Sequence, residues 1–235
     1  MKHLLSRPKA TNIFKPRRAR GTNFFRACLC AALFSGSALL SACSTLTPVP
    51  KTSAAAAFTS GNYTLDKTHA ALLVRISHFG VSSYVGRFNG VDAVLDFDQA
   101  KPESASLRAA VQTASLDVNN ESFAKTLTGP EWLDSAAYPE AVFVLSNVAV
   151  TGENTGTASG QLTLRGITHP VSFEVKFLAG ITNPLTRKYT VGFEAKGDIK
   201  RSDYGIDKFL SIAGDKFDFD TVEIEFNGEF QRSAP

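Results

Sequence analysis

Apolar and polar residues alternate along most of the chain after residue 60. In VSFEVKF (171–177), VGFEAKGDIK (191–200) and TVEIEFNGEF (221–230), nearly every second residue is apolar and most of the residues between are polar or charged. A period of two places successive side chains on opposite faces of a strand. These segments therefore predict strands with one apolar and one wet face.

The same reasoning predicts further strands over 71–78, 84–97, 106–117, 141–150 and 157–165. Turn-like pieces such as TGENTG and RGITHP join them. The segment 105–118 is rich in alanine, but its alternation of apolar and polar positions favours a strand over a helix. Helical spacing is confined to the region around 121–135. About eight strands without crossover helices predict an antiparallel barrel or sandwich.

Glycines favour the barrel over the sandwich. Gly86, Gly90, Gly192 and Gly197 fall inside strand-like stretches, where they permit the bends that a closing sheet needs. The small Ala195 beside the large Phe193 would leave room inside, and an eight-stranded barrel can hold one small ligand. The same alternation would also pack a solid core, so both interiors remain open at this point.

The first 42 residues read as a lipoprotein-type signal peptide. A leader with eight Lys and Arg residues and no acidic residue precedes an apolar stretch from Ala27 to about Leu40. That stretch is short for a membrane span but suits a signal-peptide core. The following LSAC sequence predicts cleavage before Cys43 and attachment of lipid to its thiol. An ordinary signal peptide with an incidental cysteine is the alternative.

After cleavage the protein would be anchored to a membrane through Cys43, because several acyl chains exceed what stable anchoring requires. Ser44 follows Cys43, and the absence of Asp there resembles the outer-membrane sorting pattern of lipoproteins. Residues 43–60 then form a flexible tether rich in Ser, Thr, Ala and Pro. We therefore expect a periplasmic, lipid-anchored protein with a folded domain over 61–231.

Charge argues against a nucleic-acid partner. Without the leader, 17 Lys and Arg stand against 22 Asp and Glu, a net charge of −5. Cys28 and Cys30 lie in the leader, so the mature chain has no pair of cysteines for a disulfide or a metal.

The mature sequence offers little for catalysis. His69, His78 and His169 are scattered, without the spacing of a zinc site. A Gly-x-Ser-x-Gly elbow, a phosphate loop and a dinucleotide fingerprint are all missing from it. The acidic run DKFDFD (215–220) lacks the pattern of a calcium loop. We therefore expect no catalytic residues, no metal and no cofactor, and an enzyme acting on lipids ranks last among the hypotheses.

Four blocks of the sequence resemble the YceI-like polyisoprenoid-binding proteins. They are SHFGVSSYVGRFNG (77–90), AAYPEAVFVLSNV (136–148), ASGQLTLRGITHPVSFEV (158–175) and KRSDYGID (200–207). The blocks occur in the family order, and the resemblance extends over essentially all of 61–230. One block departs from the common form: LTGPEWLD (127–134) is closer to the subgroup found beside cytochrome b561-type membrane proteins.

This resemblance implies an extended eight-stranded lipocalin-like barrel that holds a long isoprenoid, a quinone or another amphiphilic lipid without a covalent cofactor. From strand parity we predict that inward side chains line the lipid tail: Phe88, Phe143, Phe173, Phe193, Ala195 and Phe226. Head-group or lid candidates are His78, Arg201, Leu127 and Trp132. Trp132 and Leu127 belong to an aromatic-rich segment over 121–138 that either covers the barrel mouth or packs outside the barrel. The main alternative function is a lipid-anchored assembly protein that supports a membrane redox partner such as a cytochrome b561-type protein.

Overall fold

The computed structural model describes residues 58–98, 100–213 and 217–233. The predicted signal peptide (1–42), the lipidated Cys43 and most of the predicted tether lie outside these residues. The strands are β1 (Gly61–His78), β2 (Ser82–Phe88), β3 (Val91–Phe97), β4 (Ser106–Gln112), β5 (Leu116–Asp117), β6 (Glu140–Val150), β7 (Thr155–Leu164), β8 (Ile167–Thr182), β9 (Tyr189–Lys200) and β10 (Thr221–Arg232). The helices are α1 (Glu121–Leu127) and α2 (Leu210–Ala213), with 3-10 turns η2 (Pro102–Ser104), η3 (Thr113–Ser115) and η4 (Arg201–Tyr204).

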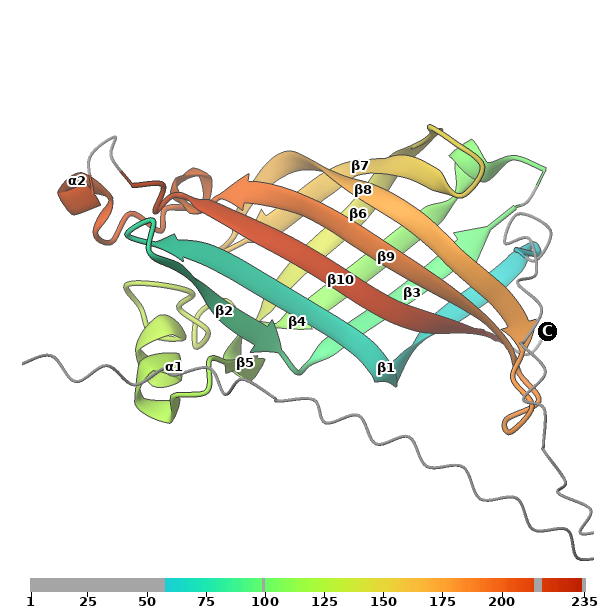
Figure 1. The fold of residues 1–235 in the computed structure, drawn as a ribbon, viewed down its shortest axis with the longest axis horizontal. Coiled ribbons are helices and arrows are strands. Elements are labelled where there is room, and N and C mark those ends of the chain that lie inside the picture. The colour runs from blue at the N-terminus through green and yellow to red at the C-terminus, as the bar shows by residue number, and fades with distance from the viewer. Residues whose placement is uncertain (1–57, 99, 214–216, 234–235) are drawn as a thin grey trace, which may run out of the picture. The chain divides into compact units, whose positions relative to one another are not determined.

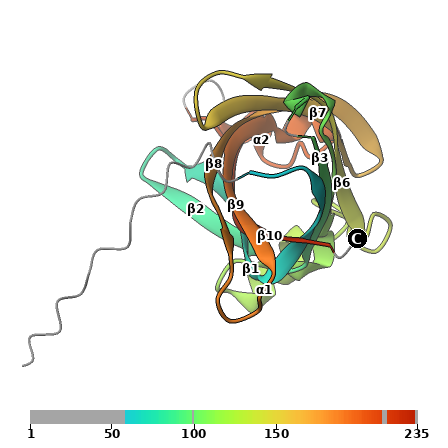
Figure 2. The ribbon, with the colours of Figure 1, turned by 90° about the vertical axis from the view of Figure 1, so that its right-hand side faces the viewer.

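Eight strands close into an antiparallel ring. The sheet runs β10-β9-β8-β7-β6-β4-β3-β1, and β1 pairs with β10 to complete it. Figure 2 shows this ring from one end. Two shorter strands, β2 and β5, extend the sheet at the far end of β1. The predicted all-β, lipocalin-like barrel of eight antiparallel strands is thus confirmed.

Two predicted strands are interrupted, and this corrects the sequence interpretation. The segment 84–97 divides into β2 and β3 at Gly90, and 106–117 divides into β4 and β5 at η3. At the break, the Gln112 amide donates to the Gly90 carbonyl oxygen at 2.8 Å, and the Gly90 amide donates to the Ser115 hydroxyl at 2.8 Å. A side chain at Gly90 would come within 2.8 Å of the Gln112 Cβ. This close approach makes the bend, which lets β1 pair with β3 near its start and with β2 near its end.

The end of the barrel where β1 begins is packed solid, and we call it the closed end. Its buried side chains are Tyr63, Leu65, Ala93, Leu95, Phe177, Val191 and Phe230. Phe58, just before β1, stacks on Phe97 with ring centroids 3.6 Å apart. In Figure 1 this end lies on the right, beside the C-terminus, and α1 and α2 lie at the opposite end.

Beyond the closed end, glycines let phenylalanine rings lie against the wall. A Cβ at Gly197 would come within 2.7 Å of the Phe173 ring, and one at Gly160 within 2.7 Å of the Phe143 ring. Both glycines have the same strand parity as inward-facing residues, and the two rings meet edge to face at 5.4 Å. The rings therefore occupy space that side chains at these positions would fill, and the lumen stays open.

We predict that Gly197→Ala lowers the free energy of unfolding by about 1–3 kcal/mol, because the added methyl group must displace the Phe173 ring or the Ser172 carbonyl. The matched control is Gly192→Ala on the same strand, where the nearest atom to the added Cβ would be at an ordinary 3.6 Å. That control should be neutral or slightly stabilising, since alanine has fewer unfolded conformations than glycine. Urea unfolding of both variants measures the difference, and equal stability would contradict the ring contact.

Candidate binding cavity

Between the closed end and the helical end the barrel is hollow. The cavity has a volume of about 330 Å³ and is partly open to solvent. Its walls are almost entirely apolar side chains from alternate strand positions, such as Leu72, Val74 and Ile76 of β1 and Val222, Ile224 and Phe226 of β10. Of the two interiors that the alternation allowed, the structure has the hollow one.

Most of the predicted wall residues lie on this cavity. Phe88, Phe143, Phe173, Ala195 and Phe226 all line it. Phe193 faces inward but packs in the closed end instead, with its ring centroid 5.5 Å from that of Phe177 and 5.9 Å from that of Phe230. Strand parity assigns a face to each residue but not its depth along the barrel, and Phe193 and Ala195 differ only in depth. Contact of any of these residues with a lipid stays a prediction.

The 118–139 segment fills the place where the sheet is not continuous. On this side of the barrel, β5 pairs only with β2, and β6 begins against β4. The Asn120 side chain caps α1 by accepting from the Phe123 amide at 3.1 Å. The turn after α1 is held where the Leu133 amide donates to the Leu127 carbonyl at 3.0 Å.

Four side chains of this segment, Val118, Leu127, Trp132 and Leu133, line the cavity. Its junction with the barrel is fixed by Thr113, whose hydroxyl donates to the Tyr138 carbonyl at 2.7 Å. Of the two placements that the sequence allowed, the turn after α1 therefore belongs to the cavity wall.

Arg201 also reaches the cavity, but its guanidinium is occupied by the chain itself. Only 4% of this residue is exposed. Its Nε, Nη1 and Nη2 donate to the carbonyl oxygens of Phe219, Ile206 and Lys208 at 2.6, 2.7 and 2.7 Å. Burial lowers the pKa of the guanidinium, while the charges of Asp220 and Asp207 oppose the shift. The three bonds join η4 to the connection that leads into β10, so Arg201 holds this end of the barrel together.

The Arg201 guanidinium carbon also lies 5.3 Å from the centre of the Trp132 ring, within cation–π distance. This contact joins the 118–139 segment to the connection before β10. A head-group contact for Arg201 stays a prediction.

His78 lies away from the cavity. It ends β1 with an exposed side chain, and its ring meets Phe79 edge to face at 4.8 Å. Its role beside a head group also stays a prediction. The sequence interpretation missed other wall residues: the parity of β1 would have found Leu72 and Val74, whereas Ile206 and Leu133 come from irregular segments without a period.

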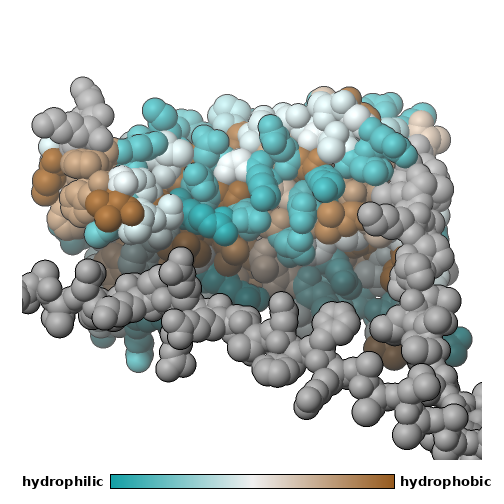
Figure 3. Space-filling model, in the orientation of Figure 1, coloured by the Kyte–Doolittle hydropathy of each residue, from teal (hydrophilic) through white to brown (hydrophobic). Residues whose placement is uncertain are grey.

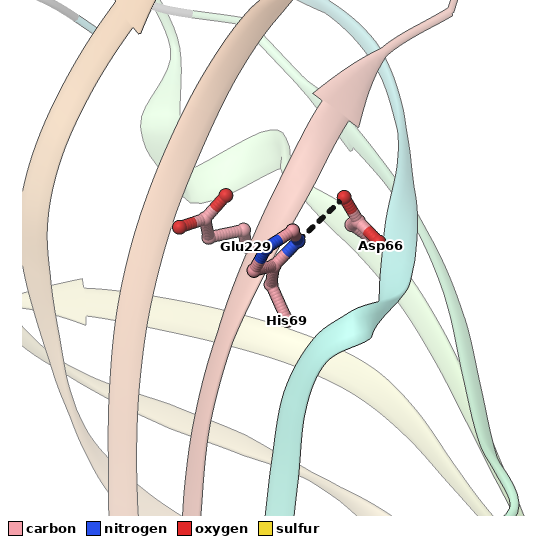
Figure 4. Close-up of side chains that lie close together, drawn as sticks. All are labelled: Asp66, His69 and Glu229. Atoms are coloured by element: carbon pink, nitrogen blue, oxygen red, sulfur yellow. Dashed lines mark hydrogen bonds and ion pairs between the residues drawn. The ribbon is translucent and has the colours of Figure 1, made fainter. Parts of the chain in front are cut away.

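A separate polar cluster, Asp66, His69 and Glu229, lies on the outer surface (Figure 4). The Asp66 carboxylate accepts from the Thr68 hydroxyl at 2.7 Å, from Gln231 Nε2 at 2.5 Å and from His69 Nδ1 at 3.0 Å when that nitrogen carries a proton. The bonds from Thr68, its hydroxyl first, and from His69 lower the Asp66 pKa to about 2. They hold the bulge at which the pairing of β1 with β10 shifts between Leu65 and Ala70. Because both carboxylate oxygens are engaged, we interpret the cluster as a structural turn.

The part of the chain that the structure describes contains no helix with the length and apolar character needed to cross a bilayer.

Comparisons with known proteins point to one family. The model of the YceI-like domain matches residues 63–230. A UPF0312 protein of Azotobacter vinelandii is 34% identical over 190 residues, which cover 80% of this chain and 92% of the relative. Protein YceI of Escherichia coli is 34% identical over 161 residues, covering 68% of this chain and 83% of the relative. The resemblance read from the four sequence blocks is thereby confirmed.

Solved structures have the same fold. BcnA of Burkholderia cenocepacia matches with a TM-score of 0.62 and 25% identity over 70% of this chain and 98% of BcnA. A polyisoprenoid-binding domain of Saccharophagus degradans matches with a TM-score of 0.55 and 15% identity over 73% of this chain and 98% of that domain. In both of these solved proteins the barrel accounts for nearly all of the chain.

We predict that Asp66→Asn lowers the pKa of His69, because the bond and the charge of Asp66 are the main causes that raise it above 6.5. A pH titration of the His69 ring protons by NMR measures this shift. Asp92→Asn, which removes a carboxylate paired with Lys67 instead, should leave His69 unchanged.

Asp66 and His69 make the free energy of unfolding depend on pH in two separate ranges. Asp66 has a folded pKa of about 2, below its unfolded value, so its contribution is full above the unfolded pKa and disappears as the pH falls toward 2. His69 has a raised folded pKa, so its contribution is present below pH 6.5 and disappears as the pH rises through the folded value. Denaturant unfolding of the wild type and Asp66→Asn should therefore converge toward pH 2. A constant difference at every pH would contradict this assignment.

Proposed function

Because the chain belongs to the YceI-like family, we propose that its barrel binds and carries a long isoprenoid or another amphiphilic lipid. The proposal is for binding, without a chemical reaction on the lipid. It concerns the lipid tail first, since the cavity walls consist almost entirely of apolar side chains.

The observation that carries this proposal is the cavity of about 330 Å³ with apolar walls. Transfer of a hydrocarbon tail from water into such a space is favourable by roughly 0.8 kcal/mol per methylene. Part of this gain is lost in ordering the flexible tail, and a membrane offers the tail a similar environment. The net exchange between membrane and protein is then close to balance, which is what a carrier requires.

Two polar groups on the cavity support an uncharged tail as the occupant. Arg201 donates to three backbone carbonyls, and the Thr113 hydroxyl donates to the Tyr138 carbonyl. These groups are satisfied within the protein, so an apolar ligand leaves none of their bonds broken. The Saccharophagus degradans domain that shares this fold is described as polyisoprenoid-binding, which supports the same class of ligand. Quinones and polyprenyl chains both fall within it.

We further propose that the protein works in the periplasm, anchored through a lipidated Cys43 to the outer membrane, beside a cytochrome b561-type partner. The leader, the LSAC sequence and Ser44 support the anchor and its place. The LTGPEWLD block, with Trp132 on the cavity wall, supports the partner class.

Filling the cavity is the direct test of lipid binding. We predict that Ala195→Trp reduces the amount of bound isoprenoid at least about tenfold, because the indole must occupy space that the tail needs. Ala195 lies opposite Phe226 on β10 and Val175 on β8, in the middle of the wall. Native mass spectrometry with lipid extraction, on residues 49–235 purified without detergent, measures the bound lipid.

The matched control is Lys176→Trp, which adds the same ring beside Val175 on the exposed face of β8. It should bind lipid as the wild type does. If Ala195→Trp does not fold, Ala195→Leu provides a smaller filling. A wild-type barrel that carries no lipid and takes none up from added quinones or polyprenyl phosphates would overturn the proposal and favour the assembly protein.

Anchoring is tested separately. We predict that Cys43→Ser moves the full chain from the membrane fraction to the soluble periplasmic fraction, because the thiol that accepts the lipid is lost. Cell fractionation followed by immunodetection measures the distribution. A wild-type chain whose Cys43 carries no acyl chain by mass spectrometry would exclude Cys43 as the anchor, and the binding proposal would be unaffected.

A further inference from the structure

A group of exposed apolar side chains lies at the helical end of the barrel, and we call it the apolar tip. It consists of Phe79, Val81, Phe209, Ile212 and Phe217, which are 46%, 85%, 51%, 73% and 38% exposed. Phe79 and Val81 belong to the turn between β1 and β2, and the other three belong to the connection from η4 through α2 to β10. Figure 1 shows both segments at the end opposite the C-terminus, and Figure 3 shows hydrophobic side chains gathered there.

The two segments of the apolar tip contact each other. The Phe79 ring meets the Phe217 ring edge to face at 5.7 Å and the Phe219 ring at 4.7 Å. These contacts leave much of Phe79 and Phe217 open to solvent. The described residues of both segments therefore contribute to one surface.

The apolar tip is continuous with the cavity. The Phe209 ring lies 6.2 Å from the Trp132 ring, and Trp132 lines the cavity. The opposite end of the barrel is closed by its packed aromatic cluster. A tail that leaves the cavity through the helical end therefore passes Trp132 and reaches the tip.

Two of these rings belong to residues with a strained backbone. Phe79 has a φ of 56° and Phe209 a φ of 67°, in the left-handed region that bulky residues rarely adopt. Glycine or asparagine would fit both positions with less strain. Strained phenylalanines kept exposed at the helical end indicate that the rings themselves have a use there.

The lysine that lies beside Phe209 is paired with a carboxylate. Lys208 pairs with Glu131 at 2.5 Å, and its ammonium lies 5.6 Å from the centre of the Phe209 ring. The aromatic and aliphatic side chains of the tip, rather than a cationic patch, therefore provide its attraction to another surface. An occupant of matching chemistry is uncharged and apolar beneath a polar layer, which describes the interface of a bilayer.

We propose that the apolar tip inserts into the surface of a lipid bilayer and presents the cavity mouth to it, so that the tail passes between bilayer and barrel without crossing water. The chain before the barrel permits this orientation. The described chain begins at Phe58, in the closed end, 15 residues after Cys43. Fifteen residues extend to about 50 Å, and β8, with 16 residues, is of about the same length. An anchor at Cys43 is thus compatible with a tip that faces the same membrane.

The test uses residues 49–235, which lack Cys43, and uncharged phosphatidylcholine vesicles. We predict that the wild-type barrel floats with the vesicles in a density gradient, and that Phe79→Asn with Phe209→Asn reduces the bound fraction about tenfold. Asparagine tolerates the positive φ at both positions, so the fold is kept. The matched control is Val150→Asn with Leu185→Asn, which removes two exposed apolar side chains beside turns at the closed end. This control should float like the wild type.

Docking and lipid binding are separated by a second measurement. Native mass spectrometry of both double variants, with isoprenoid supplied in solution, should show uptake equal to that of the wild type. A wild type that does not float, or tip variants that float equally well, would overturn the docking proposal even where uptake is normal. Dimerisation of the wild type through the tip, seen by analytical ultracentrifugation and lost in the tip variant, would overturn it in favour of a second copy as the occupant.

Discussion

Pairing of β1 with β10 is the interaction on which the rest of the structure depends. The ladder begins at Tyr63 with Arg232 and ends at Ile76 with Val222. It joins the two ends of the folded chain and pairs the edges that β1 and β10 would otherwise leave free. Closure also gives every strand an inner face, so a simple alternation of residue types becomes an interior. The bulge held by Asp66 lets this long ladder follow the curvature of the barrel.

Closure alone does not make a cavity, because inward side chains could fill the barrel throughout. The two halves of this barrel differ in what they place inside. At the closed end, large rings of neighbouring strands, such as Phe177, Phe193 and Phe230, pack against one another inside the barrel. In the other half, Phe143 and Phe173 lie over glycines of neighbouring strands and leave the centre open. The position of small residues opposite large ones thus determines where the barrel is solid and where it is hollow.

The helical end is built from irregular segments that are held by specific polar bonds. Arg201 binds three carbonyls of the connection before β10 and stacks on Trp132. A network of this kind orders loops that the sheet does not reach, and its buried groups are all the more costly to disturb. The same end carries the exposed apolar side chains, and Trp132 joins them to the cavity wall. In our proposal the polar bonds and the exposed apolar side chains serve one purpose. The bonds fix the shape of the cavity mouth, and the apolar side chains bring it to a lipid surface.

The sequence by itself determined the fold class, the presence of about eight barrel strands and the inward face of most wall residues that we assigned. These follow from a local period of two and from the family blocks, which need no knowledge of distant contacts. Five of the six wall positions chosen by parity, including Phe143 and Ala195, lie on the cavity for this reason.

Only the tertiary structure decided how deep a residue lies along the barrel axis and where a predicted strand is interrupted. It also decided what the irregular segments do. Phe193 packs in the closed end because its position along the axis depends on how eight strands are staggered. The break at Gly90 depends on a close approach of Gln112, and the place of Trp132 depends on a gap between β5 and β6. Such contacts join residues far apart in the chain, so a local periodic pattern does not predict them.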